Sequence, residues 1–166
     1  MIRYPAPLRP GDKIAVTSPS AGASGPGAER VDFCVDWLRT AGYDVVVGQC
    51  MDGSGLTSAP AEQRAAELTV MLCDPDVRCV LPPWGGETAI DLVDLLDWDA
   101  LAVAEPTWLV GYSDLSTVLL PIPPDLAGQR CTATTSPTRP TDPRQACCRG
   151  PSSQPALGRT SSVTRD

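Results

Sequence analysis

Short apolar runs alternate with longer amphipathic stretches along the first 120 residues of the chain. Four of these runs are rich in β-branched residues or are bounded by glycine and proline, which is typical of buried β-strands. They are residues 13–20, 43–48, 77–82 and 107–111. The pattern therefore predicts four strands, with enough chain between them for a helix each.

The stretches between the strands carry hydrophobic residues at helical spacing. Val31, Cys34, Val35 and Leu38 recur at i, i+3, i+4 and i+7, which predicts one buried stripe on a helix. The predicted helices span residues 27–41, 61–72, 87–97 and 113–120, with a short helical turn at 100–104.

Local signals refine two of these helices. Ser58 is placed to cap the second helix, and Pro60 suits its first turn. The inner face of the third helix is expected to consist of Ile90, Leu92, Val93 and Leu96.

The order of strands and helices predicts an α/β fold. Regular alternation implies a parallel sheet with helices on both faces, as in Rossmann or flavodoxin-like domains. Ligands of such sheets bind beyond the carboxyl ends of the strands. The loops "SPSAGASGPG", "PPWGGE" and "GYSD" each follow a strand, so we expect all three to meet at one edge.

Composition divides the chain into two parts. Residues 1–120 hold every aromatic residue and carry 7 basic and 17 acidic side chains. Residues 121–166 have no aromatic residue, 8 of the 18 prolines, 12 serines or threonines, and 6 basic against 3 acidic side chains. We therefore assign residues 1–121 to an N-terminal α/β domain and expect residues 122–166 to be a disordered tail, because few large apolar side chains can be buried there.

Charge and hydropathy exclude several classes of protein. The acidic body lacks the clustered Lys and Arg that nucleic-acid binding needs. No apolar run approaches the roughly 20 residues of a membrane span, and the N-terminus lacks the apolar core of a signal peptide. The seven cysteines contain no CxxC pair, which argues against a disulfide framework and a zinc site. A cytoplasmic protein is expected, with no nucleic-acid or membrane partner.

Two further patterns have modest functional content. "SAGASGPG" places Gly22, Gly25 and Gly27 in a loop, without the order of glycines typical of phosphate-binding motifs. A non-catalytic module that binds a nucleotide or small ligand there remains an alternative. The carboxylates of the third helix favour a solvated face over a metal site; they are Asp91, Asp94, Asp97 and Asp99.

Ser113 follows the fourth strand and precedes a helical pattern, as a nucleophilic serine does in a hydrolase. "GYSDL" lacks the second glycine of the G-x-S-x-G motif, so the spacing fits a helix cap equally well. The backbone amide of Asp114 could stabilise an oxyanion at the helix start. "WGGE" offers a second amide donor, or only an ordinary strand-to-helix turn.

Taken together, "YPAPLRPGDKIAVTSPSAG", "PPWGGE" and "GYSDLSTVLL" resemble the LD-carboxypeptidase family of serine peptidases, over residues 4–120. That family includes muropeptide LD-carboxypeptidases and microcin C immunity peptidases. "PPWGGE" departs from the form found in the muropeptide enzymes and is closer to the microcin-immunity side.

The resemblance implies a function and a set of site residues. The expected reaction is hydrolysis of a peptide bond near a free carboxyl terminus, in a small peptide substrate and with no cofactor or metal. Ser113 matches the nucleophile of a Ser-Glu-His triad, and the oxyanion hole maps onto the backbone amides of Gly86 and Asp114. A homodimer is possible for an intact member.

The triad Glu and His belong to a C-terminal domain of the family that is absent here, and the chain contains no histidine. We expect the chain as given to be truncated and inactive. The family continues through a segment resembling "HGPNL…DTPY", whereas this chain reads "RCTATTSPTRPTD". One permitted set of codons for that string, read two bases later, encodes Val-His-Gly-Asn-Asn-Leu-Ala-Asp-Thr-Pro-Tyr. The tail is therefore predicted to be frameshifted.

Overall fold

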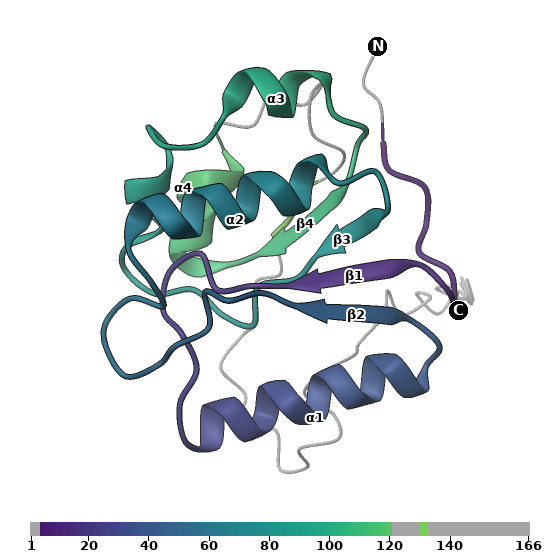
Figure 1. Ribbon diagram of the computed structural model, residues 1–166, viewed down its shortest axis with the longest axis horizontal. Helices are drawn as coiled ribbons and strands as arrows, with labels where there is room; N and C mark the ends of the chain where they lie inside the picture. The colour runs from purple at the N-terminus through teal and green to yellow at the C-terminus, as the bar shows by residue number, and fades with distance from the viewer. Residues whose placement is uncertain (1–3, 121–129, 133–166) are drawn as a thin grey trace, which may run out of the picture. The chain divides into compact units, whose positions relative to one another are not determined.

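The computed structural model describes residues 4–120 and 130–132, which form a five-stranded parallel sheet. Its strands are β1 (Lys13–Val16), β2 (Asp44–Val47), β3 (Val77–Val80), β4 (Trp108–Gly111) and β5 (Arg130–Thr132). They lie in the order β2-β1-β3-β4-β5 (Figure 1). This confirms the predicted α/β class with a parallel sheet.

Helices cover both faces of the sheet, as predicted (Figure 1). One face packs against α1 (Pro26–Thr40). The elements over the other face are α2 (Ala61–Cys73), η1 (Ala89–Leu92), α3 (Trp98–Val103), η2 (Ser113–Leu115) and α4 (Ser116–Leu119), of which η1 and η2 are 3-10 helices.

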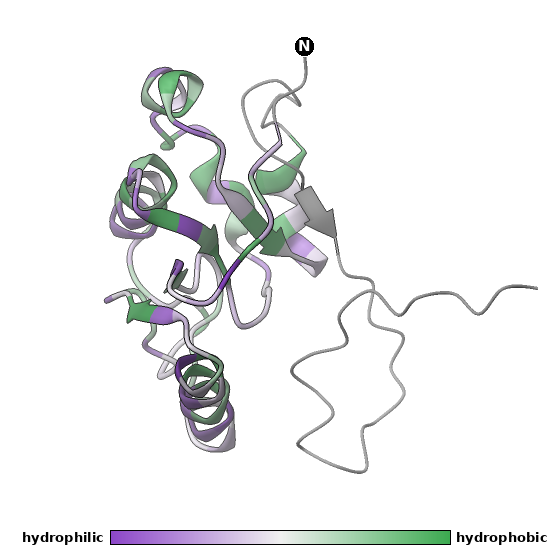
Figure 2. Cartoon of the chain, turned by 90° about the vertical axis from the view of Figure 1, so that its right-hand side faces the viewer, coloured by the Kyte–Doolittle hydropathy of each residue, from purple (hydrophilic) through white to green (hydrophobic). Residues whose placement is uncertain are grey.

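Each face has its own hydrophobic core. Under α1, Val31 and Val35 pack with Val16 and Val45 of the sheet. On the other face the larger core includes Ala15, Leu68, Val80, Leu92 and Leu119. Figure 2 shows strands coloured mainly as hydrophobic between helices of mixed colour. Burying one such leucine contributes about 1.5–3 kcal/mol, so these two layers supply the main stabilisation.

The predicted helix over 87–97 is wrong. Only Ala89–Leu92 are helical in this stretch, and Ile90 is 56% exposed although it was assigned to the inner face. The reason is tertiary hydrogen bonding. In a continuous α-helix the N–H of Asp97 would donate to the carbonyl oxygen of Val93, but here it donates to the hydroxyl of Thr69, and the Val93 carbonyl oxygen accepts from the indole N–H of Trp98.

The strand predicted over 13–20 ends at Val16. Thr17, Ser18 and Ser20 leave the sheet but remain buried. Their polar groups are satisfied by other loops, because Thr17 donates to Glu67 and Ser20 to Asp114. The chain therefore places a buried polar layer directly beyond the carboxyl end of β1.

Part of the segment predicted to be disordered is described. Residues 130–132 form β5, which pairs parallel with β4 through Leu109–Arg130 and Gly111–Thr132. The strand was not predicted. The remainder of 122–166 lies outside the described residues, and so do the predictions of a frameshift and of disorder there.

The sheet order determines where a site can form. The chain runs from β1 outward to β2 and then crosses to β3 and β4 on the other side. The chain therefore leaves the carboxyl ends of the neighbouring strands β1 and β3 in opposite directions. Ligands bind at this position in open α/β sheets.

Candidate active site

The turn after β4 holds Ser113 in a left-handed backbone conformation. Tyr112 is extended, with φ −149° and ψ 177°, and Ser113 then has φ 59°. Among the described residues, Ser113 is the only one besides glycines with a positive φ. This conformation costs a non-glycine residue about 1–3 kcal/mol and occurs preferentially at functional sites. A serine on a strained strand-to-helix turn is how an α/β hydrolase presents its nucleophile.

The alternative that Ser113 is only a helix cap does not agree with the structure. Ser113 is the first residue of η2, and Tyr112 lies at the cap position. No side-chain capping hydrogen bond forms at the start of either η2 or α4. The Ser113 side chain is exposed at the edge of the sheet, where a substrate could reach it.

Two glycines allow close packing around this turn. A Cβ atom at Gly111 would lie 3.0 Å from the Cβ of Leu115, and one at Gly85 would lie 2.9 Å from the Cβ of Ser113. Real Cβ atoms rarely approach other atoms so closely. The loop after β3 therefore lies directly against the turn that carries Ser113.

The carboxylate of Asp114 joins the three loops at the sheet edge. Its Oδ1 accepts a hydrogen bond from the backbone N–H of Gly86 at 2.6 Å. Its Oδ2 accepts one from the hydroxyl of Ser20 at 2.6 Å and one from the backbone N–H of Ala89 at 3.1 Å. The convergence of loops predicted from the sequence is thus realised through one side chain.

This network bears on the predicted oxyanion hole. The N–H of Gly86 is already directed at Asp114, whereas no hydrogen bond is formed by the N–H of Gly85 within the described part of the chain. Gly85 is also the glycine that lies against Ser113. The assignment of the Gly86 and Asp114 amides stays a prediction, and Gly85 is a further candidate donor.

Arg64 is a structural residue of the site that the sequence reading missed. Its side chain is 2% exposed and donates to the carbonyl oxygens of Pro19, Ala59 and Thr88 at 2.5, 2.9 and 3.1 Å. It also forms an ion pair with Asp91 at 3.6 Å. The guanidinium group therefore holds the loop after β1 and the loop after β3 together.

A signal for Arg64 was present in the sequence. Arg64, Leu68 and Leu72 follow one another at intervals of four, and all three are buried on one face of α2. A charged residue in a buried stripe must find hydrogen-bond partners. That position predicts a structural arginine rather than a solvated one.

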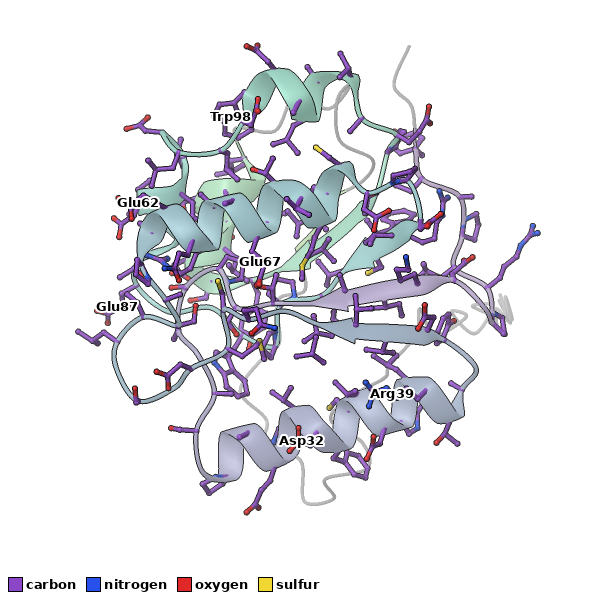
Figure 3. All side chains as sticks on the ribbon, viewed as in Figure 1. Asp32, Arg39, Glu62, Glu67, Glu87 and Trp98 are labelled. Atoms are coloured by element: carbon purple, nitrogen blue, oxygen red, sulfur yellow. The ribbon has the colours of Figure 1, made fainter. Side chains whose placement is uncertain are left out.

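Glu67, also on α2, was missed as well. It points toward the ends of β1 and β2 (Figure 3). Its carboxylate accepts from the hydroxyl of Thr17 at 2.5 Å and from the backbone N–H groups of Gln49 and Cys50 at 2.6 and 3.2 Å. Glu67 thereby ties the loop after β2 to that after β1.

Ser58 does not cap α2, which corrects the sequence prediction. Pro60 is at the cap position, and no side chain forms a capping bond there. The Ser58 hydroxyl instead donates to the carbonyl oxygen of Ser18, and its backbone N–H donates to that of Ser20 at 2.9 Å. Ser58 thus supports the loop after β1.

Two of the three glycines in the glycine-rich loop, Gly22 and Gly27, pack closely against protein atoms. The indole N–H of Trp84 donates to the carbonyl oxygen of Gly22 at 3.1 Å, and a Cβ at Gly27 would lie 3.0 Å from the Trp84 ring. Gly22 lies closer still to its neighbour, because a Cβ there would overlap the backbone carbonyl of Asp52. These glycines serve protein packing, which weakens the case for a nucleotide in this loop.

The groups beside Ser113 are poor general bases. Burial raises the pKa of the Tyr112 hydroxyl, and the Arg30 charge opposes that shift. Tyr112 is therefore protonated at neutral pH. The Asp114 carboxylate accepts three hydrogen bonds and is directed at the loops. A base for Ser113 is not found among these neighbours in the described part of the chain.

Two of the four acidic residues singled out in the sequence have structural partners. Asp91 pairs with Arg64, and Asp97 accepts from the N–H of Ala100 at 2.9 Å and caps α3. No group of three or more potential metal ligands is found among the residues that the structure describes.

A serine on a strained turn directly beyond a strand of a parallel α/β sheet is the arrangement that serine hydrolases of this fold class use for their nucleophile. The chain belongs to the LD-carboxypeptidase family, because the family pattern for the LD-carboxypeptidase N-terminal domain matches residues 14–127. The resemblance seen in the sequence is therefore confirmed.

Individual relatives agree with this assignment. A Streptomyces coelicolor protein proposed to be a carboxypeptidase, SCO6489, is 37% identical over 119 residues, which are 69% of this chain and 37% of that protein. The microcin C7 self-immunity protein MccF of Escherichia coli is 32% identical over 115 residues, 69% of this chain and 33% of that protein.

Solved structures show the same fold. MccF in complex with aspartyl sulfamoyl adenosine superposes with a TM-score of 0.64 at 29% identity, covering 72% of this chain and 35% of that one. An MccF-like protein from Bacillus anthracis superposes with a TM-score of 0.62 at 27% identity, covering 70% and 35%. This chain thus spans about a third of the length of its relatives.

Within the described ranges, no helix is long and apolar enough to cross a membrane.

Proposed function

We propose that this chain carries the nucleophile-bearing domain of a serine carboxypeptidase and that Ser113 is the nucleophile. The left-handed φ of Ser113 is the observation that supports this most directly. A strained serine at the end of a strand has no structural advantage of its own, since glycine would adopt φ 59° without cost. Its exposure and its place beyond β4 suit attack on a bound carbonyl group.

The proposed reaction combines the geometry of the turn with the activity that the family implies. The Ser113 oxygen attacks the carbonyl carbon of a peptide bond near a free carboxyl terminus and gives up its proton to a base. The backbone N–H groups of Asp114 and of Gly85 or Gly86 stabilise the resulting oxyanion. A well-placed donor of this kind contributes about 100- to 1000-fold to the rate.

A histidine base for Ser113 is not present in this sequence. The family resemblance implies that the triad Glu and His come from a C-terminal domain. Removing triad members lowers the rate by several orders of magnitude. We therefore expect no significant turnover by the chain as given.

Two substrate classes fit the family, namely muropeptides of peptidoglycan and microcin C-like peptidyl adenylates. The likeness to microcin C7 self-immunity proteins supports the second. We place the reaction in the cytoplasm, on a small peptide substrate and without a cofactor.

The test begins by resequencing the gene across codons 118 to 170. A frame that restores the "HG…DTPY" segment is then expressed beside the present chain. Hydrolysis of a peptide with an L,D bond and of a peptidyl adenylate is followed by mass spectrometry. The longer product should hydrolyse one of the two, and S113A should lower its kcat/KM by about a thousandfold or more.

Ser116→Ala is the matched control, because Ser116 lies one helical turn from the same sheet edge. It should leave kcat/KM within a factor of a few of the unsubstituted protein. Full activity of S113A in the longer product would reject Ser113 as the nucleophile.

A further inference from the structure

We propose that the side chain of Asp114 is a positioning residue that holds Ser113 in its left-handed conformation. This rests on the proposed function only in calling Ser113 a nucleophile. The backbone amide of Asp114 was assigned to the oxyanion hole, but its carboxylate has a separate role. It binds the loops after β1 and β3 and so fixes the turn after β4.

Both the side chain and the backbone of Asp114 form hydrogen bonds. The carboxylate is held by the N–H of Gly86, the N–H of Ala89 and the hydroxyl of Ser20. In the backbone, the carbonyl oxygen of Asp114 accepts a hydrogen bond from the hydroxyl of Thr117 at 2.7 Å. Asp114 is therefore immobilised by four hydrogen bonds directly after the strained residue.

The partners of Asp114 are themselves fixed. The Ser20 oxygen accepts from the N–H of Thr88 at 3.1 Å, and the carbonyl oxygen of Thr88 accepts from Arg64. Because Arg64 and Ser20 are both buried, this layer cannot exchange its partners for water without opening the fold. The strain at Ser113 persists because rigid surroundings over-determine the conformation.

Replacing Asp114 by Asn tests the carboxylate with little change of shape. An amide side chain has one acceptor oxygen and one NH2 group that only donates. The two carboxylate oxygens now face three donors, two of them backbone N–H groups. In either orientation of Asn, at least one backbone N–H faces another donor, so the turn should lose its anchor.

The experiment is NMR spectroscopy of the present chain, which needs no catalytic activity. The three-bond HN–Hα coupling and the carbon chemical shifts of Ser113 report its φ. In D114N, the left-handed signature of Ser113 should disappear, and the amides of Gly86 and Ala89 should exchange with solvent about tenfold faster or more. Amides of β1 and β3 should keep their protection. Asp94→Asn, at an exposed position, should leave all of these signals unchanged.

A folded D114N variant in which Ser113 keeps its left-handed signature would overturn the proposal. If D114N loses the protection of β1 and β3, Ser20→Ala decides, because it removes one partner of the carboxylate and leaves both backbone partners. Faster exchange at Gly86 in S20A supports the network, and unchanged exchange rejects it.

The outcomes separate the two proposals. A left-handed Ser113 that depends on Asp114, together with a longer gene product that lacks hydrolysis, would reject the proposed function and leave the positioning role intact. If the longer product hydrolyses substrate in a way that depends on Ser113, and the φ of Ser113 is unaffected in D114N, the positioning role is rejected and the proposed function stands.

Discussion

The carboxylate of Asp114 accepts a 2.6 Å hydrogen bond from the backbone N–H of Gly86. The residue that follows the proposed nucleophile is thereby bound to the loop that faces it across the sheet edge. A charge-assisted bond this short is stronger than a neutral one. Because the same N–H was a predicted oxyanion donor, the finding favours Gly85 as the amide that is free to meet a substrate.

The strain at Ser113 predicts an unusual stability profile. Ser113→Gly should raise the free energy of unfolding by about 1 kcal/mol relative to Ser113→Ala, because glycine adopts φ 59° without a Cβ clash. Urea unfolding followed by circular dichroism measures the difference. The control is Ser116, which has φ −58°. There, Gly should be less stable than Ala by about 0.5–1 kcal/mol. The same order of Gly and Ala at both positions would contradict a left-handed Ser113.

Close packing at Gly85 predicts sensitivity to a single methyl group. The Cβ of Gly85→Ala would lie 2.9 Å from the Cβ of Ser113 and 3.1 Å from the carbonyl oxygen of Tyr112. Overpacking of this kind costs about 1–3 kcal/mol. Gly55→Ala is the control, because its Cβ would meet nothing nearer than 3.9 Å, and its melting temperature should change little. Equal melting temperatures for both variants would show that the loop after β3 does not lie against the Ser113 turn.

The buried Arg64 predicts a large effect on stability at a position that is not proposed to take part in the reaction. Arg64→Met removes the donors to three backbone carbonyl oxygens and should lower the free energy of unfolding by about 3 kcal/mol or more. Arg64→Lys should rescue little of it, since an ammonium group cannot reproduce the guanidinium fork. Arg30→Met on the exposed side of α1 should stay within about 0.5 kcal/mol of the unsubstituted chain. If denaturant unfolding gives Arg64→Met and Arg30→Met the same free energy of unfolding, the structural role of Arg64 is disproved.

The Cys50 thiol predicts how stability depends on alkaline pH. Burial and the negative charge of Glu67 raise the pKa of Cys50 from 9.0 to about 11. The thiol ionises at a lower pH in the unfolded chain than in the folded chain. The free energy of unfolding should therefore fall as pH rises from about 9 toward 11. Urea midpoints at a series of pH values, measured under reducing conditions, show the slope. Cys50→Ala should reduce that slope, and an unchanged slope would mean that Cys50 ionises normally in the folded chain.

Much of the framework could be predicted from the sequence because it depends on local patterns. The Val31, Val35 and Leu38 stripe predicted α1 to within one residue at each end, since hydrophobic periodicity dominates a long surface helix. The parallel sheet followed from the alternation of such elements with short apolar strands. Ser113 was located by its place between a strand and a helix.

What could not be predicted depends on contacts between distant residues. Residues 87–97 have a helical pattern, yet the N–H of Asp97 donates to Thr69 and the Val93 carbonyl oxygen accepts from the Trp98 indole, so only Ala89–Leu92 are helical. Thr69 lies 28 residues from Asp97. The left-handed φ of Ser113 likewise could not be predicted. The "GYSDL" motif lacks the second glycine that marks the usual nucleophile turn.

The most direct test of the central claim is the reactivity of Ser113 toward a fluorophosphonate when imidazole replaces the missing base. Imidazole takes the proton of the Ser113 hydroxyl, the oxygen attacks phosphorus and fluoride leaves. Peptide mapping by mass spectrometry compares Ser113 with Ser24, an exposed serine of the loop after β1. We predict that Ser113 is labelled first and that its rate rises with imidazole concentration. Equal, imidazole-independent labelling of Ser113 and Ser24 would contradict the assignment of Ser113 as a nucleophile.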